Sequence, residues 1–106
     1  MFARNIFLNL KPNTIAEFTK TMEEEIVPLL RKQKGFQDVI TLSVPGGREV
    51  VASSFWDQKE SAQAYNSTAY PEVLKILDKF LDGTPHVRTF DVLGSTCHKI
   101  SARAAA

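Results

Sequence analysis

The chain opens with a stretch whose side chains alternate between two faces from residue 2 to residue 10. One side carries Arg4, Ile6, Leu8 and Leu10, and the other carries Ala3, Asn5, Phe7 and Asn9. A period of two residues is typical of a β-strand, so this pattern predicts a first strand. The Lys-Pro-Asn sequence that follows predicts its end.

The next segment changes to steps of three and four residues, which predicts an amphipathic helix. Its apolar stripe consists of Ile15, Phe18, Met22, Ile26, Leu29 and Leu30. We expect the side chain of Asn13 or Thr14 to cap the start of this helix. Pro28 should kink the helix without ending it. The helix should end at Lys34, with Gly35 in the left-handed conformation.

Two β-rich runs, at residues 36–44 and 49–56, flank a loop that contains two glycines, and they predict an antiparallel hairpin. A second helix should start directly after the hairpin, because Asp57 and Glu60 have the spacing of a capping box.

An Asn-Ser-Thr sequence at residues 66–68 interrupts the second helix, and Pro71 suits the first turn of a restarted segment. Residues 86–95 alternate again and predict the last strand. The predicted order is therefore β-α-β-β-α-β, an α+β fold of ferredoxin-like topology. We expect one domain over residues 1–100 and a flexible tail over residues 101–106.

Two helices with one apolar stripe each can cover only one face of a four-stranded antiparallel sheet. The second face would carry Asn5, Phe7, Asn9 and Phe90, which is too apolar a set for a freely solvated surface. This predicts a homodimer that pairs sheet against sheet and leaves a small-molecule pocket between each sheet and its helices.

Composition narrows the choice of partners. The 106 residues carry a formal charge of +1, so neither nucleic acid nor an anionic membrane surface is expected as a partner. Cys97 is the only cysteine, which excludes an intrachain disulfide, and the first residues are too polar for the core of a signal peptide. We therefore expect a cytoplasmic protein. Cys97 and His98 lack the second ligand pair of a zinc site, so no metal is predicted.

Three segments carry a family resemblance: EEEIVPLLRKQKGF, VVASSFWDQKESAQAY and AYPEVLKILDKF. With the polar first strand, they make the chain resemble the antibiotic biosynthesis monooxygenase (ABM) type of dimeric α/β barrel. The resemblance implies one of three roles: a cofactor-independent oxygenase of quinols and polyketide phenols, a haem-degrading enzyme, or a protein without known chemistry.

Haem-degrading relatives would require an Asn on strand one and a Trp and a His on helix two. Asn5 fits the first position, but Tyr65 stands where the Trp belongs, and residues 73–80 contain no His. Because haem needs an axial ligand, haem degradation is disfavoured and no cofactor is predicted.

The candidate site residues are polar or aromatic side chains near the expected pocket. Tyr65 and His86 are the catalytic candidates, since a hydroxyl can hold a phenolic oxygen and an imidazole can accept its proton. The predicted substrate-binding residues are Asn5, Asn9, Phe7, Trp56, Tyr70 and Phe90. For Trp56 a packing role is favoured over a binding role.

Two functions remain open. The first is a cofactor-independent monooxygenase acting on a small electron-rich aromatic, a phenol, quinol or anthrone, because such a substrate can itself give electrons to oxygen once deprotonated. The alternative is a non-catalytic module for small-molecule binding or assembly. A closed cavity lined by several of Asn5, Asn9, Tyr65 and His86 would favour the enzyme.

Overall fold

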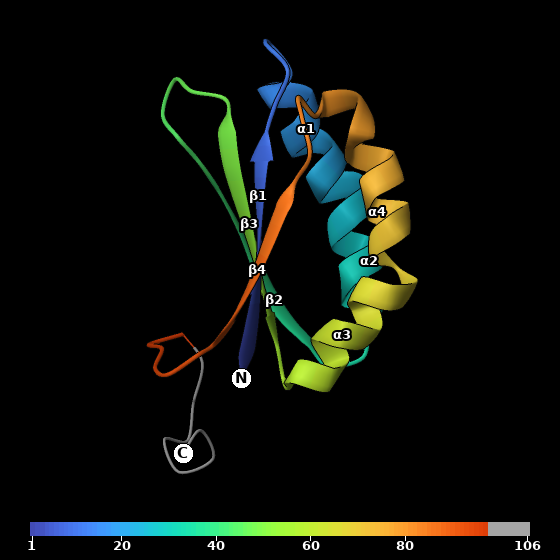
Figure 1. Ribbon diagram of the computed structural model, residues 1–106, viewed down its shortest axis with the longest axis vertical. Helices are drawn as coiled ribbons and strands as arrows, with labels where there is room; N and C mark the ends of the chain where they lie inside the picture. The colour runs from blue at the N-terminus through green and yellow to red at the C-terminus, as the bar shows by residue number, and fades with distance from the viewer. Residues whose placement is uncertain (98–106) are drawn as a thin grey trace.

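The computed structural model describes residues 1–97, which form one four-stranded antiparallel sheet with its helices on one side (Figure 1). The strands are β1 (Phe2–Asn9), β2 (Phe36–Ser43), β3 (Glu49–Trp56) and β4 (His86–Asp91). Their order in the sheet is β2-β3-β1-β4, with the first strand in the middle. The predicted α+β ferredoxin-like class is confirmed, and this sheet is open rather than closed into a barrel.

The first helical rod consists of α1 (Ile15–Thr21), a π-helical turn (Met22–Ile26) and α2 (Val27–Arg31). The expected kink at Pro28 is therefore a widening of the turn before it. Pro28 cannot donate a hydrogen bond and crowds the carbonyl four residues earlier, and longer bonds such as Val27 N–H to the Met22 carbonyl relieve this conflict.

Both ends of this rod differ from the prediction. Thr14 stands at the N-cap, but its hydroxyl donates to the Lys11 carbonyl at 2.7 Å and caps nothing. The last helical residue is Arg31, three residues before Lys34. Gly35 does have a positive φ of 82°, and its carbonyl accepts a hydrogen bond from the N–H of Asp57 at 2.8 Å, which ties the start of β2 to the end of β3.

The second helical rod consists of α3 (Lys59–Thr68), α4 (Tyr70–Leu77) and a 3-10 turn (Asp78–Phe80). It is interrupted as predicted, but the break follows the Asn-Ser-Thr sequence at residues 66–68, which stays helical. Ala69 forms the junction, and Pro71 lies in the first turn of α4 as predicted. The predicted capping box does not form, because the helix begins one residue later, with Gln58 at its N-cap.

The last strand is shorter than expected and ends at Asp91 instead of residue 95. Its antiparallel partner β1 begins at Phe2, which pairs with Asp91, so the only bond beyond this pair runs from Val92 N–H to the Met1 carbonyl within the described residues. The predicted tail, residues 101–106, lies outside the described residues, as does His98.

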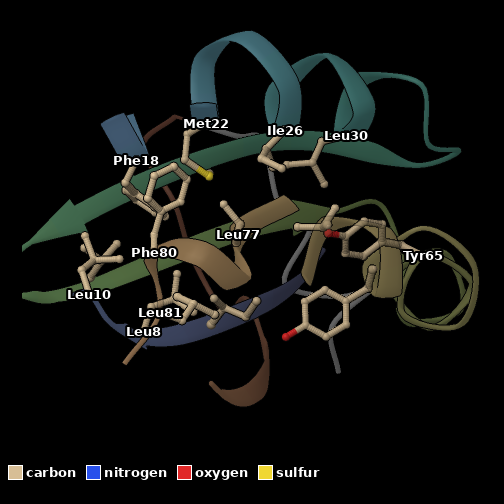
Figure 2. Packing of buried hydrophobic residues seen from close by; sticks show 14 of the residues in the cluster. Leu8, Leu10, Phe18, Met22, Ile26, Leu30, Tyr65, Leu77, Phe80 and Leu81 are labelled. Carbon is tan, nitrogen blue, oxygen red and sulfur yellow. The ribbon is translucent and has the colours of Figure 1, made fainter. Parts of the chain in front are cut away.

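The hydrophobic core lies between the sheet and the helices. Its fully buried side chains are Leu10, Phe18, Ile26, Val50, Trp56 and Phe80. Phe18 and Phe80 meet edge to face, with ring centroids 6.1 Å apart, at one end of this core, and Tyr65 lies at the other end (Figure 2). In residues 1–97 no helix has the length and apolar character needed to cross a membrane.

Candidate functional site

One cation lies inside the core, at the Tyr65 end. The alternation of β1 directs Arg4 toward the helices together with Ile6 and Leu8, and only 4% of Arg4 is exposed. Its guanidinium carbon Cζ is 4.0 Å from the ring centroid of Tyr70 and 5.3 Å from that of Tyr65. Arg4 Nη2 also donates to Asn66 Oδ1 at 2.8 Å. Strand one and the break in the second helical rod therefore meet at this guanidinium.

Two residues of β3 fix this arrangement from the sheet side. Ser54 Oγ donates to the Arg4 carbonyl at 3.2 Å and accepts a hydrogen bond from Trp56 Nε1 at 2.9 Å. The Trp56 ring stacks on Tyr65, with centroids 5.0 Å apart and an interplanar angle of 30°. We call Arg4, Ser54, Trp56, Tyr65, Asn66 and Tyr70 the arginine–tyrosine cluster.

Among the described residues, no carboxylate pairs with Arg4. Within residues 1–97, the ion pair that forms is the exposed one between Arg48 and Asp82, at 3.9 Å. A buried charge without a counter-ion costs several kcal/mol of desolvation, as an order of magnitude. The two tyrosine rings offset part of this cost through cation–π contacts of about 0.5–2 kcal/mol each, and the Asn66 amide supplies a neutral acceptor. The cluster therefore has an unmet preference for a negative charge.

Tyr65 is the acid of the cluster. Burial raises the pKa of Tyr65 from 10.0 to about 12, while the positive charge of Arg4 lowers it and Tyr70 raises it. The Tyr65 hydroxyl therefore stays protonated throughout the neutral range, where it can donate a hydrogen bond but cannot act as a base.

Two spaces open onto the cluster. A cavity of about 30 Å³ lies between sheet and helices, and Arg4, Ser54 and Tyr65 are its polar lining residues among apolar side chains such as Met22 and Ile26. By the measure that about 10–15 Å³ holds one water, it has room for a water or a diatomic molecule but not for an aromatic ring.

The second space is an open groove of about 510 Å³ between β4 and α3. Arg4 and Asn66 line its inner side, and its volume lies within the usual range of small-molecule sites, roughly 300–1,000 Å³. Arg4 therefore lines both the small cavity and the groove.

The structure divides the predicted site residues between two faces of the sheet. Tyr65, Tyr70 and Trp56 come together in the cluster. Trp56 also has the packing role that was favoured for it, since it is fully buried, meets Phe36 edge to face and stacks on Tyr65.

The remaining predicted residues lie on the outer face, which the helices leave uncovered; they are Asn5, Phe7, Asn9, His86 and Phe90. His86 is exposed and pairs with Phe7. None of these five lines the cavity or the groove. Of the four polar groups expected around a closed cavity, only Tyr65 is there.

Sequence reasoning missed Arg4 and Asn66. The sequence did contain a signal for Arg4, since it is the single charged residue on the otherwise apolar side of strand one. Asn66 gave no such signal, because it lies among polar residues near the end of α3, 62 positions from its partner. Among residues 1–97, no three His, Cys, Asp or Glu side chains gather as a metal site requires, and the absence of any cofactor stays a prediction.

Comparison with known proteins places this geometry among solved folds. SnoaB, a cofactor-independent oxygenase from Streptomyces nogalater, superposes with a TM-score of 0.74 at 13% identity, over 92% of this chain and 97% of its own. A monooxygenase from the ActVA-Orf6 gene of Streptomyces coelicolor, solved with nanaomycin D, gives a TM-score of 0.70 at 17% identity, over 89% and 88%. Protein NE2512 of Nitrosomonas europaea, of unknown function, gives 0.74 at 16%, over 90% and 91%.

At these identities the structural likeness establishes the fold. The search of curated proteins found no match at a significant level. The sequence profile of the family described as antibiotic biosynthesis monooxygenase, however, matches residues 1–90, which is most of the chain and includes every member of the arginine–tyrosine cluster. This chain therefore belongs to the antibiotic biosynthesis monooxygenase family.

Proposed function

We propose that this protein is a cofactor-independent monooxygenase that oxidises a small electron-rich aromatic, a phenol, quinol or anthrone, whose ionised ring oxygen binds at Arg4. The observation that carries the proposal is the buried guanidinium itself, which has two aromatic neighbours and access to both the groove and the cavity, and which pairs with no carboxylate of residues 1–97. A phenolate supplies the negative charge that this cation lacks, and an aromatic ring suits the tyrosines around it.

The groove and the cavity differ in size, and each suits one of the two reactants. The aromatic ring fits the groove, and dioxygen fits the small cavity on the other side of Arg4. Arg4 favours the phenolate over the phenol by electrostatic attraction in a site of low dielectric. Tyr65, which stays protonated, is placed to donate a second hydrogen bond to an oxygen atom at the cavity.

The reaction needs no external reductant, because the substrate supplies the electrons. The phenolate transfers an electron to dioxygen, and the two then combine at a ring carbon. That carbon becomes a carbonyl with one oxygen atom, and the second oxygen atom leaves as water with two hydrogens of the substrate. In a phenol or quinol, one hydrogen comes from that carbon and one from the ring hydroxyl, which becomes a second carbonyl; in an anthrone, both come from the methylene carbon. Arg4 contributes by increasing the fraction of ionised substrate.

A second candidate function is binding without turnover. It is favoured by one observation: no His, Asp or Glu of residues 1–97 belongs to the arginine–tyrosine cluster or lines the cavity or the groove, so the site lacks a base of the usual kind. An oxygenase of this design must use substrates that lose their proton to solvent. His86, the base expected from the sequence, lies on the outer face.

We also propose that two copies pair through the outer face to complete the dimeric α/β barrel. Phe90 is 38% exposed and Leu42 is 55% exposed there, next to the half-buried Phe7. Burying such side chains against a second copy removes apolar surface from water at about 25 cal/mol per Å². A cytoplasmic location stays part of this proposal.

Oxygen uptake by the purified protein tests the function. A panel of naphthols, quinols and anthrones is supplied without added cofactor, and the rate should rise with pH as the substrate ionises. Arg4→Met should lower the rate about tenfold or more at neutral pH, since one unit of phenol pKa is about 1.4 kcal/mol. Arg48→Met, which removes an exposed arginine, is the matched control. Saturable binding with no oxygen uptake would instead establish the second candidate function.

A further inference from the structure

The groove between β4 and α3 carries more positive charge than Arg4 alone. Lys59 also lines it, and no Asp or Glu is among the residues that do. The protein as a whole has nearly equal numbers of acidic and basic residues, 12 and 13, so two cations without an acid are a local property of this groove.

The two cations stand at opposite ends of one helical stripe. Lys59, Gln63 and Asn66 follow each other at steps of four and three residues on α3, which places them on one face of that helix, toward the groove. Seven residues at 1.5 Å each separate Lys59 from Asn66 by about 10 Å along the helix axis. Because Asn66 is hydrogen-bonded to Arg4, the guanidinium marks the other end of this stripe from Lys59.

The other polar residues that line the groove are neutral. Gln63 and Ser67 come from α3 and Thr89 from β4, while Phe2 and Val87 supply apolar surface on the strand side. A flat apolar body with one acidic group at each end matches this distribution of charge. The groove is long enough along α3 for a fused two-ring aromatic.

We infer that the substrate is a hydroxyaryl carboxylate, with its ring hydroxyl at Arg4 and its carboxylate at Lys59. This inference rests on the proposed function for the role of Arg4, and it adds the substrate class. Lys59 is exposed, so its contribution to affinity is that of a surface ion pair, at most about fivefold at low ionic strength.

Anaerobic calorimetric titration tests this assignment. The probes are a hydroxynaphthoate that carries its two groups at opposite ends of the ring system and the methyl ester of the same compound. The acid should bind about three- to fivefold more tightly than the ester, and the preference should shrink as salt is added. Lys59→Gln should abolish the preference while leaving the affinity for the ester unchanged.

Lys75→Gln is the matched control, because it removes the same charge from the exposed side of the neighbouring helix α4. Equal binding of acid and ester by the wild type, no binding of either, or equal losses in the two lysine variants would overturn the inference. Since binding is measured without oxygen, turnover of neutral naphthols together with no acid preference would refute only the carboxylate assignment. A clear acid preference without any oxygen uptake would refute only the oxygenase.

Discussion

The two faces of the sheet come from the same four strands, yet they place their polar residues in opposite environments. Arg4 and Asn5 are adjacent on β1, and Arg4 is buried among tyrosine rings while Asn5 lies half-buried on the outer face, paired with exposed Arg88. Inside the core, a charge acts in a low dielectric and interacts strongly with whatever approaches it. On the outer face, water and salt weaken the same kind of interaction. We therefore expect the functional groups of this fold to be its buried polar residues rather than the polar residues of the outer face.

The largest expected effect concerns dimerisation, which we expect to involve the outer face and not the helix-covered face. Phe90→Glu introduces a charge that a symmetric sheet-to-sheet dimer would bury twice, at several kcal/mol for each copy as an order of magnitude. Light scattering at micromolar concentration should change from a dimer mass to a monomer mass. Phe90→Leu should remain dimeric. A monomeric wild type would remove the outer face as an interface.

A second prediction compares how much a side chain on each face contributes to the free energy of unfolding. Trp56→Ala should lower the free energy of unfolding by about 3–5 kcal/mol, because the ring is fully buried in the core. Leu42→Ala, at a position that is 55% exposed on the outer face, should cost less than about 1 kcal/mol in dilute solution. Urea denaturation measures both values, and similar costs would contradict the assignment of the core to the helix side.

Several elements of the fold follow from local sequence, and the site follows only in part. The alternation in strand one, the glycine-containing hairpin and Pro71 each have a short-range cause, and the structure bears them out. Pro28 was recognised as a disturbance, but its outcome as a π turn depends on how the flanking residues Met22 and Ile26 stay buried. The last strand was overextended, because its length is set by its partner β1.

The site shows the same limit. Tyr65 was predicted because a tyrosine on the second helix has an evident chemical use. Arg4 was assigned to its correct face by the alternation, but its aromatic neighbours and Asn66 come from segments more than sixty positions away, which no periodicity reveals. Polar residues on the outer face were predicted to line the pocket, because the alternation of a strand does not show which of its two faces the helices cover.

A third prediction concerns the alkaline limit of stability. Below about pH 10, Tyr65 is protonated in both folded and unfolded chains. Between 10.0 and about 12 only the unfolded chain releases this proton, so stability is lost as pH rises through that window. Tyr65→Phe should lose less of its unfolding free energy there, by up to about 2–3 kcal/mol. Urea denaturation at several alkaline pH values checks this, and equal losses in both proteins would contradict it.

The smallest expected effect is that of His86→Ala. His86 is exposed on the outer face and lines neither the groove nor the cavity, so the oxygen-uptake rate and its pH profile should stay unchanged. A lost or shifted ionisation step in the pH profile of this variant would restore His86 as the base and move the site to the outer face.

If the buried Arg4 holds an ionised phenolic oxygen, it must lower the pKa of a bound phenol. Naphthol bound under anaerobic conditions is titrated by the absorbance of its phenolate. In the wild type its pKa should lie about 1–3 units below that of free naphthol, as expected for an acid beside a buried arginine. Arg4→Lys should keep part of this shift, and Arg4→Met should abolish or reverse it. The same naphthol pKa in the wild type and in Arg4→Met would show that Arg4 does not hold the phenolate.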